Sequence, residues 1–314
     1  MIGVIDADVF AYKNANNHWS IEMCVNRALE SVFYLHREMG SDLSFVVTGT
    51  KSKGDRELVY PEYQANRLGG PPDPERRERV SEISKALKLV HGRYEELVGV
   101  TAFDQEADDL CRQLMLREQK THGELNVTLY SEDKDLRMVK GKHHLKDGTA
   151  MLVSDLGVIT QRVAEKSKKT YATGALQWAL QMLIGDKVDN IPGIGLVGQP
   201  YVANILGMKV QTTSCGEVRA FQLLSKPNLK TEEEVIKHVI NLYRSSGADW
   251  QFRFKRNAVL LWIRRNPNIL DVFDWIDEKT GIKINASDIQ DKVARGKSEG
   301  YSEKYLKQPT VMNE

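Results

Sequence analysis

The sequence predicts an α/β fold with a mostly parallel central sheet, followed by a region made mainly of helices. Two observations carry this prediction. Over the first half of the chain, apolar strand-like runs alternate with amphipathic helical stretches, which is the pattern of βαβ units. After about Thr170 the pattern becomes mainly helical, and residues from about 291 to the end are polar and mixed in charge. We therefore expect a first domain at 1–170, a helical region at 171–290 and a polar tail at 291–314.

The strand-like runs are short, and polar residues follow them. Strands are predicted at residues 2–5, 43–48 and 125–130. Helices are predicted at about 22–37, 105–118, 174–184, 231–245 and 250–264. A further helix is expected to begin at Asp73, because Asp-Pro-Glu supplies an N-cap, a proline at the first helical position and an acidic first turn. Asp6 and Asp133 each follow a strand, so both should lie at the edge of the sheet where ligands bind.

The composition excludes several classes of protein. The chain has 314 residues, 41% hydrophobic and 28% charged, which is ordinary for a globular protein. No apolar run approaches the ~18 residues of a membrane span, and no basic segment of a signal peptide opens the chain. Three widely spaced cysteines argue against a disulfide framework and favour a reducing cytoplasm. With a net charge of only +1, any binding of nucleic acid must use local positive charge.

Acidic residues form four groups along the chain. They are Asp6; Glu106, Asp108 and Asp109; Asp133 and Asp135; and Asp186 and Asp189. Each group alone has an ordinary interpretation, as a solvated helix face or a surface turn. If they converge, however, the carboxylates repel one another strongly unless cations lie among them. Mg²⁺ prefers such oxygen ligands together with phosphates, and two ions ~3.5–4 Å apart assist phosphoryl displacement.

Two other segments indicate contact with nucleic acid. Ile191-Pro192-Gly193-Ile194-Gly195 has the composition of a helix–hairpin–helix turn, whose glycines let backbone N–H groups approach a phosphate. Residues 51–88 are rich in Lys and Arg, and Tyr60 and Tyr63 are available to stack on bases. This segment holds nearly as many acids, so a salt-bridged solvent face is an equal alternative. His143 and His144 are expected to be a surface pair.

Taken together, these motifs resemble those of the 5′-nucleases, or flap endonucleases, and particularly phage 5′→3′ exonucleases. The match runs through Val4-Ile5-Asp6, Tyr63-Gln64-Ala65-Asn66-Arg67, Glu106-Ala107-Asp108-Asp109, Ser131–Leu136 and Gly185–Gly195, over about two-thirds of the chain. The resemblance implies a PIN-like domain with a helical arch at about 51–98 and a helix–three-turn–helix element with its hairpin at 185–200.

The resemblance also implies roles for individual residues. Metal-site acids would be Asp6, Glu106, Asp108, Asp109, Asp133, Asp135, Asp186 and Asp189. The catalytic set would be Asp6, Asp108, Asp133, Asp135 and Arg67, and DNA would contact Tyr63, Arg67, Arg76, Arg77, Gly193 and Gly195. The implied cofactors are two or more Mg²⁺ ions, with Mn²⁺ as a substitute, and a monovalent cation at the hairpin.

The chain departs from the family pattern at three places. The family often has an Asp shortly after its second strand, whereas Val47-Thr48-Gly49-Thr50 offers none, so a metal ligand is missing or replaced by water. Gln64 stands where the arch usually carries Lys, so Lys51, Lys53 or Arg67 is expected to neutralise the scissile phosphate. Val197 stands where the hairpin usually continues with Lys, which predicts weaker duplex binding or binding from elsewhere.

The expected function is 5′→3′ exonuclease and 5′ flap endonuclease activity on DNA by two-metal-ion hydrolysis. The substrates would be duplex ends, nicks, gaps or flaps, with RNA in RNA–DNA hybrids as a further one, in phage DNA replication, recombination or DNA degradation. We expect a monomer without membrane contact. The alternatives are a PIN-type ribonuclease, which would be shorter and lack the segment Gly185–Gly195, and a catalytically inactive DNA-binding protein, which would gain nothing from acids facing phosphates.

Overall fold

A six-stranded sheet forms the core of the first half of the chain in the computed structural model. The structure describes residues 1–298 except 51–53, 69–72, 165–166, 196–198 and 208–214. The strand order is β3-β2-β1-β4-β5-β6. All neighbours pair in parallel except β5 and β6, which are antiparallel. The strands are β1 (Ile2–Asp6), β2 (Leu43–Gly49), β3 (Leu97–Ala102), β4 (Val127–Tyr130), β5 (Gly141–His144) and β6 (Ala150–Val153).

This topology confirms the predicted mostly parallel sheet and locates the edge of the sheet where a ligand is expected to bind. The chain winds to one side of β1 for β2 and β3, and to the other side for β4 and β5. Ligands in such sheets bind beyond the carboxyl ends of the strands at the point where the winding reverses. Here that point lies between the ends of β1 and β4.

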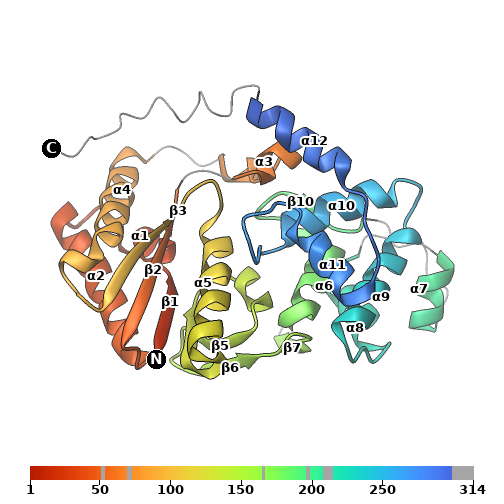
Figure 1. The fold of residues 1–314 in the computed structure, drawn as a ribbon, viewed down its shortest axis with the longest axis horizontal. Helices are drawn as coiled ribbons and strands as arrows, with labels where there is room; N and C mark the ends of the chain where they lie inside the picture. The colour runs from red at the N-terminus through yellow and green to blue at the C-terminus, as the bar shows by residue number, and fades with distance from the viewer. Residues whose placement is uncertain (51–53, 69–72, 165–166, 196–198, 208–214, 299–314) are drawn as a thin grey trace.

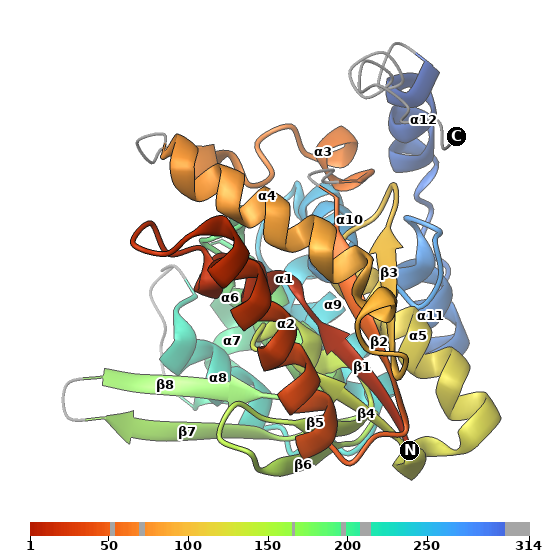
Figure 2. The ribbon, with the colours of Figure 1, turned by 90° about the vertical axis from the view of Figure 1, so that its left-hand side faces the viewer.

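Helices cover both faces of the sheet. One face carries α1 (Asp8–Asn14), α2 (Ile21–Glu38) and α4 (Pro74–Lys88), and the other carries α5 (Ala107–His122) (Figures 1 and 2). Neighbouring strand residues point to opposite faces, so Ile5 packs with the first set and Val4 with α5. The Asp73 side chain accepts a hydrogen bond from the backbone N of Arg76, as the capping pattern predicted.

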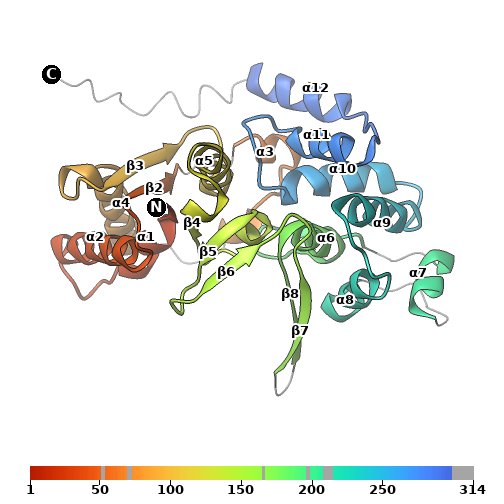
Figure 3. The ribbon, with the colours of Figure 1, turned by 60° about the horizontal axis from the view of Figure 1, so that its bottom comes forward.

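The second half is a helical body packed around α6. A hairpin of β7 (Ile159–Ala164) and β8 (Ser167–Ala172) precedes α6 (Gly174–Ile184) and projects from the body (Figures 2 and 3). Residues 174–183 are all buried, so α6 is a core helix. Around it lie α8 (Glu217–Ser225), α9 (Glu232–Arg244) and α10 (Trp250–Leu261). Helix α7 (Gln199–Leu206) lies beyond α8, and α11 (Asp271–Thr280) packs on α9 and α10 (Figure 3). No described helix is long and apolar enough to cross a membrane.

The segment expected to form an arch divides into two parts. Helix α4 packs against α1 and α2, with Ile83 and Leu87 fully buried. The earlier part, with α3 (Arg56–Val59) and the 3₁₀ helix η1 (Ala65–Leu68), lies near the strand ends and beside α12 (Ser287–Gly296) (Figure 1).

The stretch expected to be a polar tail begins as a helix. Helix α12 occupies its first residues, because Ile289 and Val293 give this helix a buried face. Residues 299–314 lie outside the described part.

The sequence patterns missed three of the six strands, β3, β5 and β6. Strand β3 begins inside the stretch assigned to the arch, about 51–98, and runs beyond it to Ala102, and Gly99 weakens its strand signal. That glycine is needed because a Cβ there would lie 2.2 Å from the carbonyl oxygen of Lys88 at the end of α4. The expectation that His143 and His144 form a surface pair was wrong, since both are buried, at 5% and 8% exposure. His143 Nε2 lies 2.7 Å from the carbonyl oxygen of Val139, which satisfies one ring nitrogen.

A buried ion cluster joins the two halves of the chain. Asp109 of α5 is fully buried and accepts hydrogen bonds from both terminal nitrogens of Arg56, at 2.8 and 2.9 Å. From the helical half, Arg264 donates through its backbone N (2.8 Å) and Nε (2.9 Å). Arg56 also donates to the carbonyl oxygen of Trp262, at 2.7 Å. Burial alone would raise the pKa of Asp109, but the two arginines lower it to about 2.

Replacing Asp109 should therefore destabilise the whole fold. Asp109→Asn leaves the buried Arg264 without the carboxylate that it pairs with and leaves Arg56 with Glu106 alone, so we expect the free energy of unfolding to fall by about 3–5 kcal/mol. Chemical denaturation measures this. Glu82→Gln on α4 is the control, because Glu82 pairs at 2.7 Å with Lys85 at the surface, where their side chains are 38% and 66% exposed, and should change stability by less than about 1 kcal/mol. Equal effects of the two substitutions would contradict the assignment.

Candidate active site

A cavity of about 670 Å³ opens at the carboxyl ends of β1, β2 and β4. Segments far apart in the sequence line it: the start of α1, the segment 56–67, the start of α5, the loop after β4, and Asp189. Its acidic residues are Asp6, Asp8, Glu106, Asp108, Glu132, Asp133, Asp135 and Asp189. The separate acidic groups of the sequence therefore meet, at the edge of the sheet where the topology places a binding site.

The loop after β4 holds the first carboxylates in place. Ser131 Oγ donates to Asp6 Oδ2 at 2.7 Å, which ties the ends of β1 and β4 together. The same hydroxyl accepts from the backbone N of Asp133, at 2.9 Å. Asp133 in turn accepts from the backbone N of Asp135, at 2.8 Å. The Asp-Lys-Asp turn is thus fixed by its own backbone, and its carboxylates share the cavity with Asp6.

A second group of acids lies where α6 ends. Ligand oxygens of Asp135, Asp186 and Asp189 lie within 4.8 Å of one another. Asp186 accepts from the backbone N of Val188 at 2.8 Å, and Gln181 donates to Asp135 at 2.6 Å. Basic side chains already neutralise part of this group: Lys134 contacts Asp186 and lies 3.6 Å from Asp135, and Arg67 pairs with Asp189. The three carboxylates are close enough together to be ligands of one cation.

The electrostatics of the first group are different. Among the described residues, neither Asp6 nor Asp108 forms an ion pair with a basic side chain, and the Asp108 carboxylate has no hydrogen-bond partner. Burial, with the charges of Asp8 and Asp133, raises the pKa of Asp6 to about 7. Burial and neighbouring acids, Asp133 first, raise the pKa of Asp108 well above its ordinary value, and burial with Asp133 raises that of Asp135 to about 7. These carboxylates are poised to receive a cation.

Glu106 lies in the cavity wall and is held by three side chains. Arg56 Nη1 donates to it at 2.5 Å, the Tyr63 hydroxyl at 2.9 Å, and Gln64 Nε2 at 3.1 Å. Tyr63 is only 2% exposed, so in this structure its ring packs in the core and is not free to stack on a base. Gln64, which replaces the expected lysine, uses its neutral amide to bind Glu106.

Asp109 has a different environment from the other acids expected to hold metal. It does not line the cavity, and its oxygens are occupied by Arg56 and Arg264. Arg76 and Arg77, expected to contact DNA, lie exposed on α4, and Arg76 donates to the carbonyl oxygen of Tyr12 at 3.3 Å.

The hairpin glycines have a packing role of their own. A Cβ at Gly193 would lie 2.3 Å from the carbonyl oxygen of Leu183 at the end of α6, so only glycine fits there. Gly195 has φ of +77°, which favours glycine. Asn257 of α10 donates to the carbonyl oxygens of Pro192 (2.6 Å) and Gly193 (3.2 Å). Val197 lies outside the described residues.

Asp8 and Tyr12 line the cavity but were not among the sequence candidates. Asp8 begins α1, and both of its carboxylate oxygens accept from the backbone N of Gly49, each at 3.1 Å. Tyr12, one helical turn further on, lines the same cavity and is 60% exposed. The sequence carried a signal that could have found both residues: Asp8 and Tyr12 are four apart, so they share a face of a helix that follows the strand ending in Asp6.

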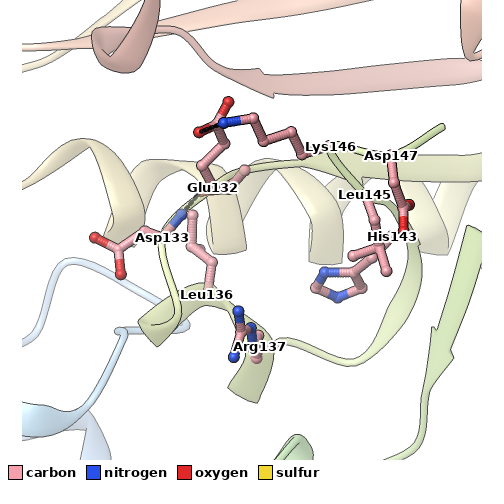
Figure 4. Close-up of a pocket in the computed structure, with 9 residues that line it drawn as sticks. Glu132, Asp133, Leu136, Arg137, His143, Leu145, Lys146 and Asp147 are labelled. Atoms are coloured by element: carbon pink, nitrogen blue, oxygen red, sulfur yellow. Dashed lines mark hydrogen bonds and ion pairs between the residues drawn. The ribbon is translucent and has the colours of Figure 1, made fainter. Parts of the chain in front are cut away.

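A second hollow of about 560 Å³ lies on the other side of the loop after β4. Glu132 and Asp133 line both hollows. Figure 4 shows the Asp133 carboxylate pointing away from Arg137 and His143, while Lys146 approaches Glu132 at 3.6 Å. The second hollow has mixed charge, so the concentration of acids is a property of the first cavity.

Comparisons with known proteins give a relative in sequence and several solved structures of similar fold. The chain matches no protein-family model. It is 29% identical over 181 residues to a 5′-3′ exonuclease of Aquifex aeolicus (strain VF5), covering 57% of this chain and 56% of that relative. The chain thus spans about half the length of the curated relative that it matches.

Solved structures of a phage T5 protein match over nearly the whole chain. The T5 5′-exonuclease with bound zinc gives a TM-score of 0.59 at 16% identity, covering 95% of this chain and 98% of that one. The T5 D15 protein co-crystallised with metal ions gives 0.54 at 14% identity, with the same coverage. A T5 D15 flap endonuclease complex with DNA and metal ions gives 0.52 at 16% identity, covering 93% and 99%. The chain has the fold of the T5 5′-exonuclease, and its resemblance to the 5′-nucleases is confirmed in sequence and in fold.

Proposed function

We propose that this protein is a divalent-metal-dependent phosphodiesterase, a 5′→3′ exonuclease and 5′ flap endonuclease acting on DNA in the cytoplasm. The observation that carries the proposal is the meeting of acids from distant segments in one cavity, where Asp6 and Asp108 form no ion pair with a basic side chain of the described residues. The substrates are duplexes with 5′ ends, flaps, nicks or gaps, and RNA in RNA–DNA hybrids is a further one. The protein acts as a monomer.

The donors in the cavity fit magnesium. All are carboxylate oxygens, which hard cations such as Mg²⁺ prefer, and Mn²⁺ can take the same place. We assign Asp6, Asp108 and Asp133 to one site and Asp135, Asp186 and Asp189 to the other. We leave Glu106 out of both sites, because Arg56, Tyr63 and Gln64 already donate hydrogen bonds to its carboxylate. We leave Asp109 out of the metal set, because its two arginine partners already satisfy its charge.

When bound, the metal ions lower the pKa of a water molecule and stabilise the charge of a phosphate during its displacement. The chain's own residues do the rest. Ser131 and the backbone of the Asp133–Asp135 turn hold the carboxylates in fixed directions. Arg67, whose side chain is 52% exposed, can leave Asp189 for a phosphate oxygen, since guanidinium groups bind both.

DNA is held outside the cavity by the surrounding elements. We propose that Arg76 and Arg77 on α4 contact the phosphates of the strand that enters, because both are exposed and Arg76 donates to the carbonyl oxygen of Tyr12. The loop of Gly193 and Gly195 would hold the duplex, with a monovalent cation at the hairpin.

The function is tested with a 5′-flapped duplex labelled at either end. Cleavage near the flap junction is expected with Mg²⁺ and not with EDTA, and Asp133→Asn/Asp135→Asn should lower the rate by more than roughly a hundredfold, since even outer-shell partners of a metal contribute 10–100-fold. Cleavage of single-stranded RNA alone would favour a PIN-type ribonuclease. Duplex binding without cleavage in Mg²⁺ or Mn²⁺ would leave a DNA-binding protein.

Metal and pH should act together on stability. Asp6 and Asp135 have pKa values of about 7 in the folded protein, above the ordinary 3.8. The folded state therefore binds more protons than the unfolded state between about pH 4 and 7, and in EDTA these acids lower stability as the pH rises through that window. Mg²⁺ should raise the Tm strongly at about pH 8 and little at about pH 5.

Thermal scans of the wild type and of Asp6→Asn/Asp135→Asn check this. The variant should lose most of the pH slope and most of the stabilisation by Mg²⁺. Stabilisation by Mg²⁺ that is equal at both pH values would contradict the assignment of these acids to the metal sites.

Tyr12 should stack on a base of the bound strand. It is exposed at the cavity wall, and stacking of a base on an aromatic ring contributes about 1–3 kcal/mol. Tyr12→Ala is expected to lower kcat/KM on a flapped duplex roughly tenfold, and Tyr12→Phe to retain activity. The control is Tyr34→Ala on α2, at a ring that is 70% exposed and does not line the cavity. Equal losses for both alanine variants would argue against stacking at Tyr12.

A further inference from the structure

The carboxylate of Asp8 lies at the end of β2, although Asp8 belongs to the first turn of α1. Both of its oxygens accept from the backbone N of Gly49, the last residue of β2. Gly49 and Asp8 line the same cavity as Asp6 and Asp108. The negative charge of Asp8 is close enough to Asp6 to raise the pKa of Asp6.

The Asp8 carboxylate fills the space that a side chain at position 49 would otherwise occupy. A Cβ built on Gly49 would lie 2.8 Å from Asp8 Oδ2, whereas the nearest atom of another residue, Ala107 Cβ, is 3.8 Å away. Gly49 is not among the glycines with positive φ, so its conformation does not require glycine. What the glycine provides is room for Asp8.

The three strand ends around the cavity can now be compared. Strand β1 ends in Asp6, and the loop after β4 carries Asp133. Strand β2 ends in Val47-Thr48-Gly49, followed by Thr50, with no acid of its own. Asp8 gives this third strand end a carboxylate that its own sequence lacks. Among the described residues, no basic side chain forms an ion pair with Asp8.

We propose that Asp8 supplies the carboxylate on the β2 side of the metal site, in place of a side chain from β2 itself. This inference rests on the proposed function, because it adds a ligand to the site that function requires. The competing explanation is structural: an acid in the first turn of α1 that is favoured by the helix dipole and links α1 to β2.

Binding of Mn²⁺ to the full-length protein, measured by titration calorimetry, separates the two explanations. Asp8→Asn keeps an oxygen that can accept from Gly49 and removes the charge. We expect it to weaken Mn²⁺ binding roughly tenfold or more and to leave the Tm in EDTA unchanged or raised. The control is Glu22→Gln, which removes an exposed acid from the first turn of α2 and should leave Mn²⁺ binding unchanged.

A relocation variant tests the position of the charge directly. Asp8→Ala opens the space beside Gly49, and Asp8→Ala/Gly49→Asp places a carboxylate there from β2. The double variant should recover Mn²⁺ affinity and flap cleavage relative to Asp8→Ala alone. The single variant Gly49→Asp should be destabilised in EDTA, because it displaces the Asp8 carboxylate from the backbone N of Gly49 and places a second negative charge beside it.

Two results would overturn the inference. In the first, Asp8→Asn binds Mn²⁺ with wild-type affinity, which would assign Asp8 a structural role. If Asp133→Asn/Asp135→Asn loses affinity in the same experiment, the proposed function still stands. A wild-type protein that neither binds Mn²⁺ nor cleaves a flapped duplex would remove the proposed function itself.

Discussion

The buried pairing of Asp109 with Arg56 and Arg264 is the constraint on which the site depends. It fixes the start of α5 against both α3, which precedes α4, and the loop that follows α10. Successive residues of a helix point about 100° apart. With Asp109 held inward, its neighbour Asp108 faces the cavity. One ion cluster therefore joins the two halves and directs a carboxylate toward Asp6 and Asp133.

The same arginine connects this cluster to the cavity wall. Arg56 donates to Glu106 as well as to Asp109, and Tyr63 and Gln64 donate to Glu106 from the other side. The segment 56–67 is thus bound to the acids at the end of the sheet. A neutral glutamine at position 64 suits this arrangement, since it donates a hydrogen bond without adding charge to a wall that Arg56 already neutralises.

The cavity concentrates like charges at a cost to stability. Burial and mutual repulsion raise the pKa values of Asp6, Asp108 and Asp135. These acids therefore destabilise the metal-free protein most at neutral and alkaline pH, where they are ionised. Lys134 and Arg67 relieve the group that contains Asp186 and Asp189. Bound cations would offset this repulsion, and this is the physical basis of the proposed metal-dependent nuclease.

The sequence by itself determined the parallel sheet, the core helix α6 and the identity of most of the acids. These follow from local patterns: apolar runs, caps and the spacing of carboxylates, together with the family resemblance. Only the tertiary structure decided which acids face the cavity. It directed Asp109 to two arginines more than 40 residues away on either side, buried Tyr63, and brought Asp8 to the end of β2. Such choices depend on long-range packing and burial, which no local pattern records.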